Sequence, residues 1–138
     1  MTAGRDEVLP ELMAGLFGRL RAGLSGGDLG DLRMSHVRVL SAVPPDGINV
    51  TELARRAGMT KQGCGQFVTY LAGAGHLTTA PDPDDGRVRL VFRSIAGDRE
   101  IERVYAALAR IEGEFAAQVG PRRYATFKKV MAELAQSD

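Results

Sequence analysis

The sequence feature that most constrains the fold is a pair of short helix signals joined by a four-residue turn. Asn49 is a good N-cap for the first helix, which should run to about Ala57. Gly58 then ends this helix, because glycine accepts the left-handed conformation that closes many helices. Thr60 caps a second helix that should reach about residues 73–75. Two short helices joined in this way are typical of a helix-turn-helix.

The second helix has an apolar face, which we expect to be buried. At roughly 100° per residue, Cys64, Phe67, Val68 and Leu71 project from the same side. Cys64 lies at the centre of this face. An inert, buried thiol is therefore favoured over a redox sensor, since a reactive thiol needs exposure and a lowered pKa.

The opposite face of the second helix carries short or amide-bearing side chains. Glutamine can pair with adenine N6 and N7, threonine can contact a thymine methyl group, and a lysine near the helix N-terminus suits a phosphate. This chemistry predicts reading of the major groove, and a solvated helix face is the alternative interpretation. The candidate DNA-binding residues here are Thr60, Lys61, Gln62, Gln66 and Thr69.

Two glycines, Gly63 and Gly65, lie inside the second helix. Each costs roughly 1 kcal/mol of helix propensity relative to alanine. Close approach of the backbone to DNA would explain Gly65. A packing requirement or neutral drift would explain it equally well.

A β-hairpin is expected next, formed by residues 77–80 and 87–93 around a polar loop. Strand alternation divides the second strand into an apolar face that packs and an arginine face that projects. The first face comprises Val88, Leu90 and Phe92, and the second Arg87, Arg89 and Arg93, with Val91 among them. Projecting guanidinium groups beside a recognition helix can reach phosphates or enter the minor groove.

The tip of this hairpin, residues 82–86, is acidic, which by itself argues against contact with DNA. Asp85 can nevertheless hold the Arg87 guanidinium in a bidentate pair and orient it. An ordinary acidic turn with a weak surface ion pair is the alternative. The candidate DNA-binding residues of the hairpin are Asp85, Arg87 and Arg89.

The remaining chain is predicted to be helical. Apolar residues at helical spacing indicate a first amphipathic helix at about residues 5–24, followed by a glycine-rich loop over residues 25–30. We expect one domain spanning residues 1–138, because 138 residues with 44% apolar and 25% charged residues suit a single globular core. Its predicted parts are a DNA-binding lobe at 32–96, including a helix at about 35–43, and flanking helices at 5–24 and 98–136.

Composition also excludes several classes of protein. No apolar run is long enough for a membrane span, and Arg5, Asp6 and Glu7 replace the apolar run of a signal peptide, so we expect a cytoplasmic protein. One cysteine and two histidines are too few for a metal site, and no catalytic constellation can be assembled. We therefore expect no enzyme activity and no cofactor. The net charge of +1 gives no support for DNA binding, which must rest on where the charges lie.

Taken in order, these segments resemble the MarR family of bacterial regulators. The resemblance rests on a helix-turn-helix followed by an aspartate-x-arginine wing, and it extends to Gly97. The matching segments are residues 32–40, 50–54, 59–62, 74–77 and 82–91. Arg93-Ser94-Ile95 departs from the Leu-Thr that the family often has there, and Gly63, Gly65 and Phe67 make the recognition helix unusual.

The resemblance implies a mainly α fold with a small β-hairpin wing (α+β), in which terminal helices form a homodimer. It implies a pseudo-palindromic operator in duplex DNA, with half-sites about 10 bp apart, recognition helices in the major groove and Arg87 in the minor groove, oriented by Asp85. Family members are commonly repressors, often released by small aromatic ligands that bind between the dimerisation helices and the DNA-binding lobe. His36 is a candidate for a polar role near such a ligand site or at the dimer interface.

A second function remains open at this stage. The glycines of the recognition helix and the acidic tip of the wing could belong to a winged-helix module that binds another protein and has weakened DNA binding. A salt-dependent affinity for duplex DNA distinguishes the two functions, because neutralising phosphates releases counterions.

Overall fold

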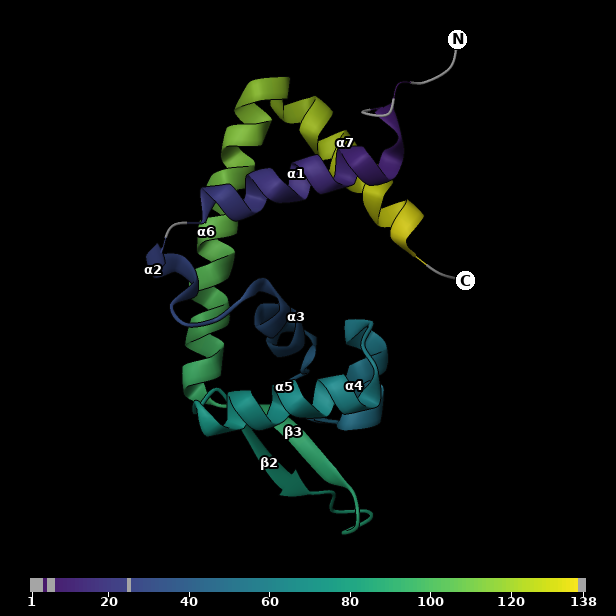
Figure 1. The fold of residues 1–138 in the computed structure, drawn as a ribbon, viewed down its shortest axis with the longest axis vertical. Coiled ribbons are helices and arrows are strands. Elements are labelled where there is room, and N and C mark those ends of the chain that lie inside the picture. Colours follow the sequence, from purple (N-terminus) through teal and green to yellow (C-terminus); the bar gives the residue numbers. More distant parts are fainter. Residues whose placement is uncertain (1–3, 5–6, 25, 137–138) are drawn as a thin grey trace. The chain divides into compact units, whose positions relative to one another are not determined.

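The computed structural model describes residue 4 and residues 7–24 and 26–136 (Figure 1). Its elements are α1 (Leu9–Gly23), α2 (Gly26–Leu29), α3 (Met34–Ala42), β1 (Ile48–Asn49), α4 (Val50–Ala57), α5 (Lys61–Gly73), β2 (Leu77–Pro81), β3 (Arg89–Arg93), α6 (Ile95–Val119) and α7 (Pro121–Ala135). The chain divides into two compact units. The central unit comprises residues 26–105, and the terminal unit comprises residues 1–25 with 106–138.

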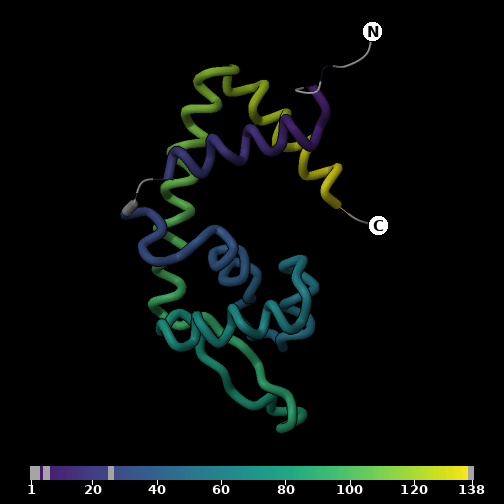
Figure 2. The backbone as a smooth tube through the Cα atoms, viewed as in Figure 1, coloured from purple at the N-terminus to yellow at the C-terminus, as the bar shows by residue number. Residues whose placement is uncertain are grey.

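The sheet of the central unit has three antiparallel strands in the order β1-β3-β2. Strands β2 and β3 run side by side to a loop at the tip (Figure 2), with Leu77 opposite Arg93 and Thr79 opposite Val91. The third strand, β1, pairs Ile48 with Val91 and was not predicted, because two residues carry no alternation pattern. The predicted fold class, mainly helical with a small β wing, is confirmed.

The buried face of β3 differs from the prediction. Val91 is fully buried, together with Ile48 and Leu77 on the neighbouring strands, whereas Leu90 and Phe92 are only half-buried. The sequence placed Val91 on the projecting arginine face. Residues on both faces of β3 are at least half-buried, namely Val91 and Arg93 on one face and Leu90 and Phe92 on the other, so simple alternation of apolar and charged residues misassigns the core side.

Arg93, predicted to project, instead turns back into the central unit. Its Nε donates to Asp98 Oδ1 at 2.8 Å, and its Nη1 donates to the Leu40 carbonyl at 3.0 Å. Only 22% of the side chain is exposed. The arginine therefore joins α3, β3 and α6, and it is not free for DNA.

Helix boundaries differ from the prediction in three places. The predicted loop over residues 25–30 contains the short helix α2, although Ser25 lies outside the described residues. The predicted start of the first helix at Arg5 also lies outside them, and α1 begins at Leu9. Helix α6 begins at Ile95 rather than about Asp98, because the Ser94 hydroxyl accepts the Gly97 N–H at 3.0 Å and so caps the first turn.

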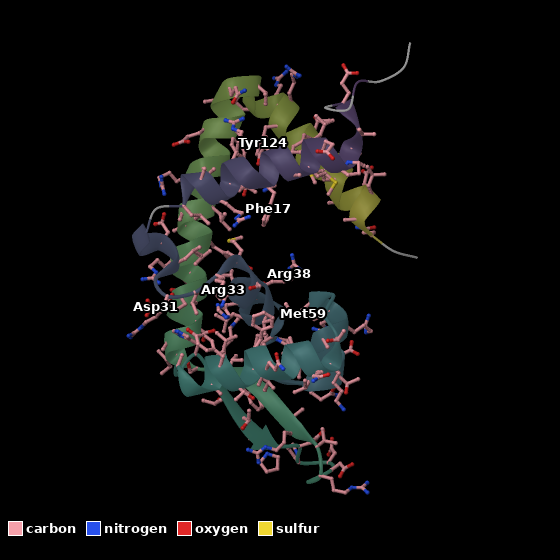
Figure 3. The ribbon with its side chains drawn as sticks, in the orientation of Figure 1. Phe17, Asp31, Arg33, Arg38, Met59 and Tyr124 are labelled. Atoms are coloured by element: carbon pink, nitrogen blue, oxygen red, sulfur yellow. The ribbon has the colours of Figure 1, made fainter. Side chains whose placement is uncertain are left out.

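The terminal unit is held by contacts between its helices. The Arg19 guanidinium of α1 lies 4.6 Å from the ring centroid of Phe115 on α6 and donates to Gln118 Oε1 at 2.9 Å. The Tyr124 hydroxyl of α7, marked in Figure 3, donates to Glu112 Oε1 of α6 at 2.6 Å. Burial, followed by this bond to a carboxylate, raises the pKa of Tyr124 to about 12.

His36 is the buried polar residue of the central core. Its Nδ1 accepts the Arg33 backbone N–H at 2.9 Å, which caps the first turn of α3. Its ring stacks on Tyr70 with centroids 4.8 Å apart and meets Phe67 edge-on at 5.2 Å. Burial, and then the charges of Arg33 and His76, lower the pKa of His36.

Within the described residues, no helix is both long enough and apolar enough to span a membrane.

Gly97→Ala should destabilise the protein. A Cβ at Gly97 would lie 2.1 Å from the backbone carbonyl oxygen of His76, so α6 and the start of β2 would have to move apart. We expect a loss of about 1–3 kcal/mol in the free energy of unfolding, measured in urea. Gly113→Ala on the same helix is the control, since its Cβ meets nothing within 4 Å and alanine is the better helix former. Equal stability of the two variants would contradict the steric argument.

His36 should make the stability depend on pH. The folded protein favours the neutral ring, so the unfolded chain binds more protons between the lowered folded pKa and the ordinary value of 6.5. This contribution is complete above pH 6.5 and is lost as pH falls through the folded pKa. Wild type should therefore lose thermal stability from pH 7 to pH 5 more steeply than His36→Asn, whose Oδ1 can still accept a hydrogen bond. Parallel profiles would exclude His36 as the titrating group.

Candidate nucleic-acid interface

Helices α4 and α5 begin and end where the sequence predicts. Asn49 Oδ1 accepts the Glu52 N–H at 2.8 Å, and Thr60 Oγ1 accepts the Gly63 N–H at 3.0 Å. Gly58 adopts the left-handed conformation with φ of 68°. Each of these two side-chain bonds satisfies one of the free N–H groups at its helix start, and together with Gly58 they fix the turn between the two helices.

The buried face of α5 sets the rotation of the helix. Cys64 and Leu71 are fully buried and Val68 is 7% exposed, which matches the predicted apolar face. Phe67 was predicted in the core but is only half-buried, because its ring packs against His36 at the border of that face. Burial raises the pKa of the Cys64 thiol, which disfavours the reactive thiolate.

The opposite face of α5 is largely exposed. Its exposed residues include every candidate predicted on this helix: Thr60, Lys61, Gln62, Gln66 and Thr69. The Thr69 hydroxyl donates to the Gly65 carbonyl at 3.0 Å, a contact that the sequence analysis did not foresee. The hydroxyl of a threonine inside a helix commonly donates to the carbonyl four residues earlier, so the position of Thr69 relative to Gly65 could have suggested the contact.

The wing holds Arg87 through Asp85. The Arg87 Nε lies 3.1 Å from Asp85 Oδ1 and its Nη2 lies 3.3 Å from Oδ2, which is the bidentate contact that the sequence predicts. The Arg87 backbone N–H also donates to Asp85 Oδ1 at 3.1 Å. These bonds lower the pKa of Asp85, while 91% of the Arg87 side chain stays exposed. The guanidinium is thus oriented and still open to solvent.

The tip that carries this pair is a hydrogen-bonded turn. The Asp82 N–H donates to the Val88 carbonyl at 2.8 Å, and the Asp84 N–H donates to Asp82 Oδ1 at 2.9 Å. Arg89, the third candidate on the wing, is exposed and donates to Thr79 Oγ1 at 2.9 Å. Arg87 and Arg89 therefore present charge from the wing, whereas Arg93 does not.

Two arginines of α4 received no role in the sequence analysis. Arg55 pairs with Glu52 one turn earlier, and Arg56 Nε lies 3.7 Å from the same carboxylate. All three side chains are at least partly exposed. Arg55 and Arg56 follow Glu52 by three and four residues, and this helical spacing of opposite charges could have suggested the cluster. It places two guanidinium groups at the end of α4.

Residues 28–88 match the family model described as MarR family. No match was found among curated proteins.

Three solved structures share the fold. "Crystal Structure of MarR" has a TM-score of 0.81 at 22% identity, covering 98% of this chain and 93% of the other. BpsR of Bordetella bronchiseptica, described for regulation of its DNA binding by 6-hydroxynicotinic acid, has a TM-score of 0.79 at 16% identity, with 100% of both chains covered. The transcriptional repressor CouR bound to a 23-mer DNA duplex has a TM-score of 0.74 at 19% identity, with 99% of both chains covered.

The match to the family model covers α3, both helices of the helix-turn-helix and the wing up to Val88, and the solved structures have the same fold over almost the whole chain. Transcriptional regulators of this family are not enzymes. Residues 28–88 of this chain match the MarR family of DNA-binding, winged helix-turn-helix transcriptional regulators, and the fold over almost the whole chain is the MarR-like fold with terminal helices.

Proposed function

We propose that this regulator binds a pseudo-palindromic operator as a homodimer and acts as a repressor that a small aromatic ligand releases. The observation that carries the proposal is the exposed polar face of α5 together with an arginine held by Asp85 on the wing. The first offers groups that suit base edges, and the second offers a charge that suits the DNA backbone or minor groove.

In this proposal α5 lies in the major groove. Gln62 and Gln66 are exposed amides that can pair with adenine N6 and N7. Lys61 and Thr60 lie at the helix N-terminus, where a phosphate is favoured both by the lysine charge and by the helix dipole. Thr69 offers its methyl group, because its hydroxyl hydrogen is already donated to Gly65.

The wing then supplies contacts beside the recognition helix. Arg87 enters the minor groove, and Asp85 limits the orientations of its guanidinium before binding, which lowers the entropy lost on contact. Arg89 contributes a second exposed guanidinium. The acidic tip does not cancel these charges, since two of the tip's carboxylates bond within the turn or to Arg87.

The terminal unit supports the homodimer. Among the described residues, neither α1 nor α7 contains a buried residue, so much of each apolar stripe is left exposed in one chain. The exposed large apolar residues of this unit include Val8, Leu9, Leu12, Met13, Phe17, Val119, Phe127, Val130, Met131 and Leu134. A second copy of the chain would cover this surface symmetrically, as a twofold dimer requires.

One relative supports repression and another supports control by a ligand. CouR is described as a repressor, and the DNA binding of BpsR as regulated by 6-hydroxynicotinic acid, an aromatic acid. We extend both properties to this chain as part of the proposal. His36 remains the proposed polar contact, and its place beside the rings of Phe67 and Tyr70 would couple a ligand there to α5.

Arg87→Ala should weaken operator binding without changing the dimer. We expect a loss of about 1–3 kcal/mol in binding free energy, because one phosphate or groove contact is removed. The slope of log affinity against log salt concentration should also become less steep by about 1. Fluorescence anisotropy with an operator selected from random duplexes measures both quantities. Asp85→Asn should produce a smaller loss, since the charge of Arg87 is kept, and the release of its orientation is partly offset by the removal of a negative charge near the DNA.

Arg122→Ala is the matched control for this series. It removes the same charge from an exposed position on α7, in the terminal unit, and should leave affinity within twofold of wild type. Wild-type affinity in Arg87→Ala would remove Arg87 from the interface. Salt-independent binding, with one stoichiometric protein partner in pull-downs, would instead favour the protein-interaction module.

Val130→Glu should dissociate the dimer. The change places a charge among the exposed apolar residues of α7, where a partner chain would have to desolvate it. Ala125→Glu introduces the same charge on the opposite face of that helix, at about 100° per residue, and should leave the dimer intact. Sedimentation velocity distinguishes the two variants, and equal masses for both would contradict dimerisation through α7.

A further inference from the structure

Gly65 is a glycine that the fold does not require. It lies inside α5, and a Cβ built on it would meet nothing within 4 Å. Its backbone is not among the positive-φ glycines of the chain. Gly97 and Gly63 differ, because their Cβ atoms would approach the His76 carbonyl at 2.1 Å and the Thr60 hydroxyl at 3.0 Å. Alanine at Gly65 would fit the free protein and favour the helix.

The surface of α5 has an open position at Gly65, a notch left by the missing side chain. Its N–H is used in the helix, and its carbonyl accepts the Thr69 hydroxyl in addition to its helix bond. The position therefore offers only a Cα methylene, with no free donor or acceptor for a base. Gln62, Gln66 and Thr69, all exposed, flank it on the outward face.

We propose that Gly65 is a specificity-determining residue that receives the 5-methyl group of a thymine in the operator. The inference rests on the proposed major-groove docking of α5. The thymine methyl is the apolar group that unmodified base pairs display in the major groove, so it is the feature that an apolar notch can select. The Thr69 methyl group forms a second apolar wall, and the neighbouring glutamines read adenines beside the thymine.

The test begins with the DNA. An operator is selected with wild-type protein from random duplexes, and each thymine is then replaced singly by uracil, which removes only the methyl group. One position in each half-site should lose about tenfold in affinity, while the other thymines change it by less than twofold. At that position, a duplex with 5-methylcytosine paired with guanine should bind more tightly than the same duplex with unmethylated cytosine, and equal affinities would contradict a site for the methyl group.

Gly65→Ala fills the notch from the protein side. The variant should unfold at a higher temperature, by roughly 2–6 °C, yet bind the thymine operator about tenfold more weakly. It should also bind the thymine and uracil operators equally, because the methyl group has lost its site. Gly73→Ala is the matched control, since that glycine ends the same helix and also has open space at its Cβ. Its affinity and thymine preference should equal those of wild type.

The outcomes separate the inference from the proposed function. Two results would overturn the proposed methyl site at Gly65 while leaving DNA binding in place. The first is wild-type affinity in Gly65→Ala, and the second is an equal loss of affinity in wild type and variant when uracil replaces thymine. Failure of wild type to select any duplex would overturn the proposed function and, with it, this inference. Fluorescence anisotropy at fixed salt supplies all of these comparisons.

Discussion

The rotation of α5 about its axis is the constraint on which the interface depends. Cys64, Val68 and Leu71 follow one another at spacings of four and three residues, which places them on one face of the helix. All three are buried in the core of the central unit. Each buried side chain of this kind contributes on the order of 1.5–3 kcal/mol, so rotating any one of them into solvent is costly. Because the angular positions of all other α5 residues follow from these three, the polar face is held outward by the core.

The wing is organised by different forces. Its base is a short sheet anchored by Val91 and by the two bonds of Arg93, whereas its tip has no apolar core and is shaped by aspartate side chains that bond to the nearby backbone. The Asp85–Arg87 pair is exposed, so its main effect is on orientation rather than on stability. A rigid base and a locally ordered tip allow a charge to be presented far from the core.

Local sequence signals predicted the parts of the site that depend on local chemistry. The caps at Asn49 and Thr60, the turn at Gly58 and the bidentate contact of Asp85 with Arg87 all involve residues close in sequence. The sequence could not place Arg93, because its partner Leu40 is 53 residues away. Strand β1 and the burial of Val91 likewise depend on tertiary pairing, which overrides a period-two pattern.

Hydrogen–deuterium exchange of the protein with and without operator duplex tests the central claim most directly, namely that the core-fixed outward face of α5 and the wing together form the DNA interface. The account predicts slower exchange on DNA binding for residues 61–69 and 82–89, with little change in α7 when the dimer is preserved. Protection confined to the terminal unit, or unchanged exchange in α5 when DNA is bound, would contradict it.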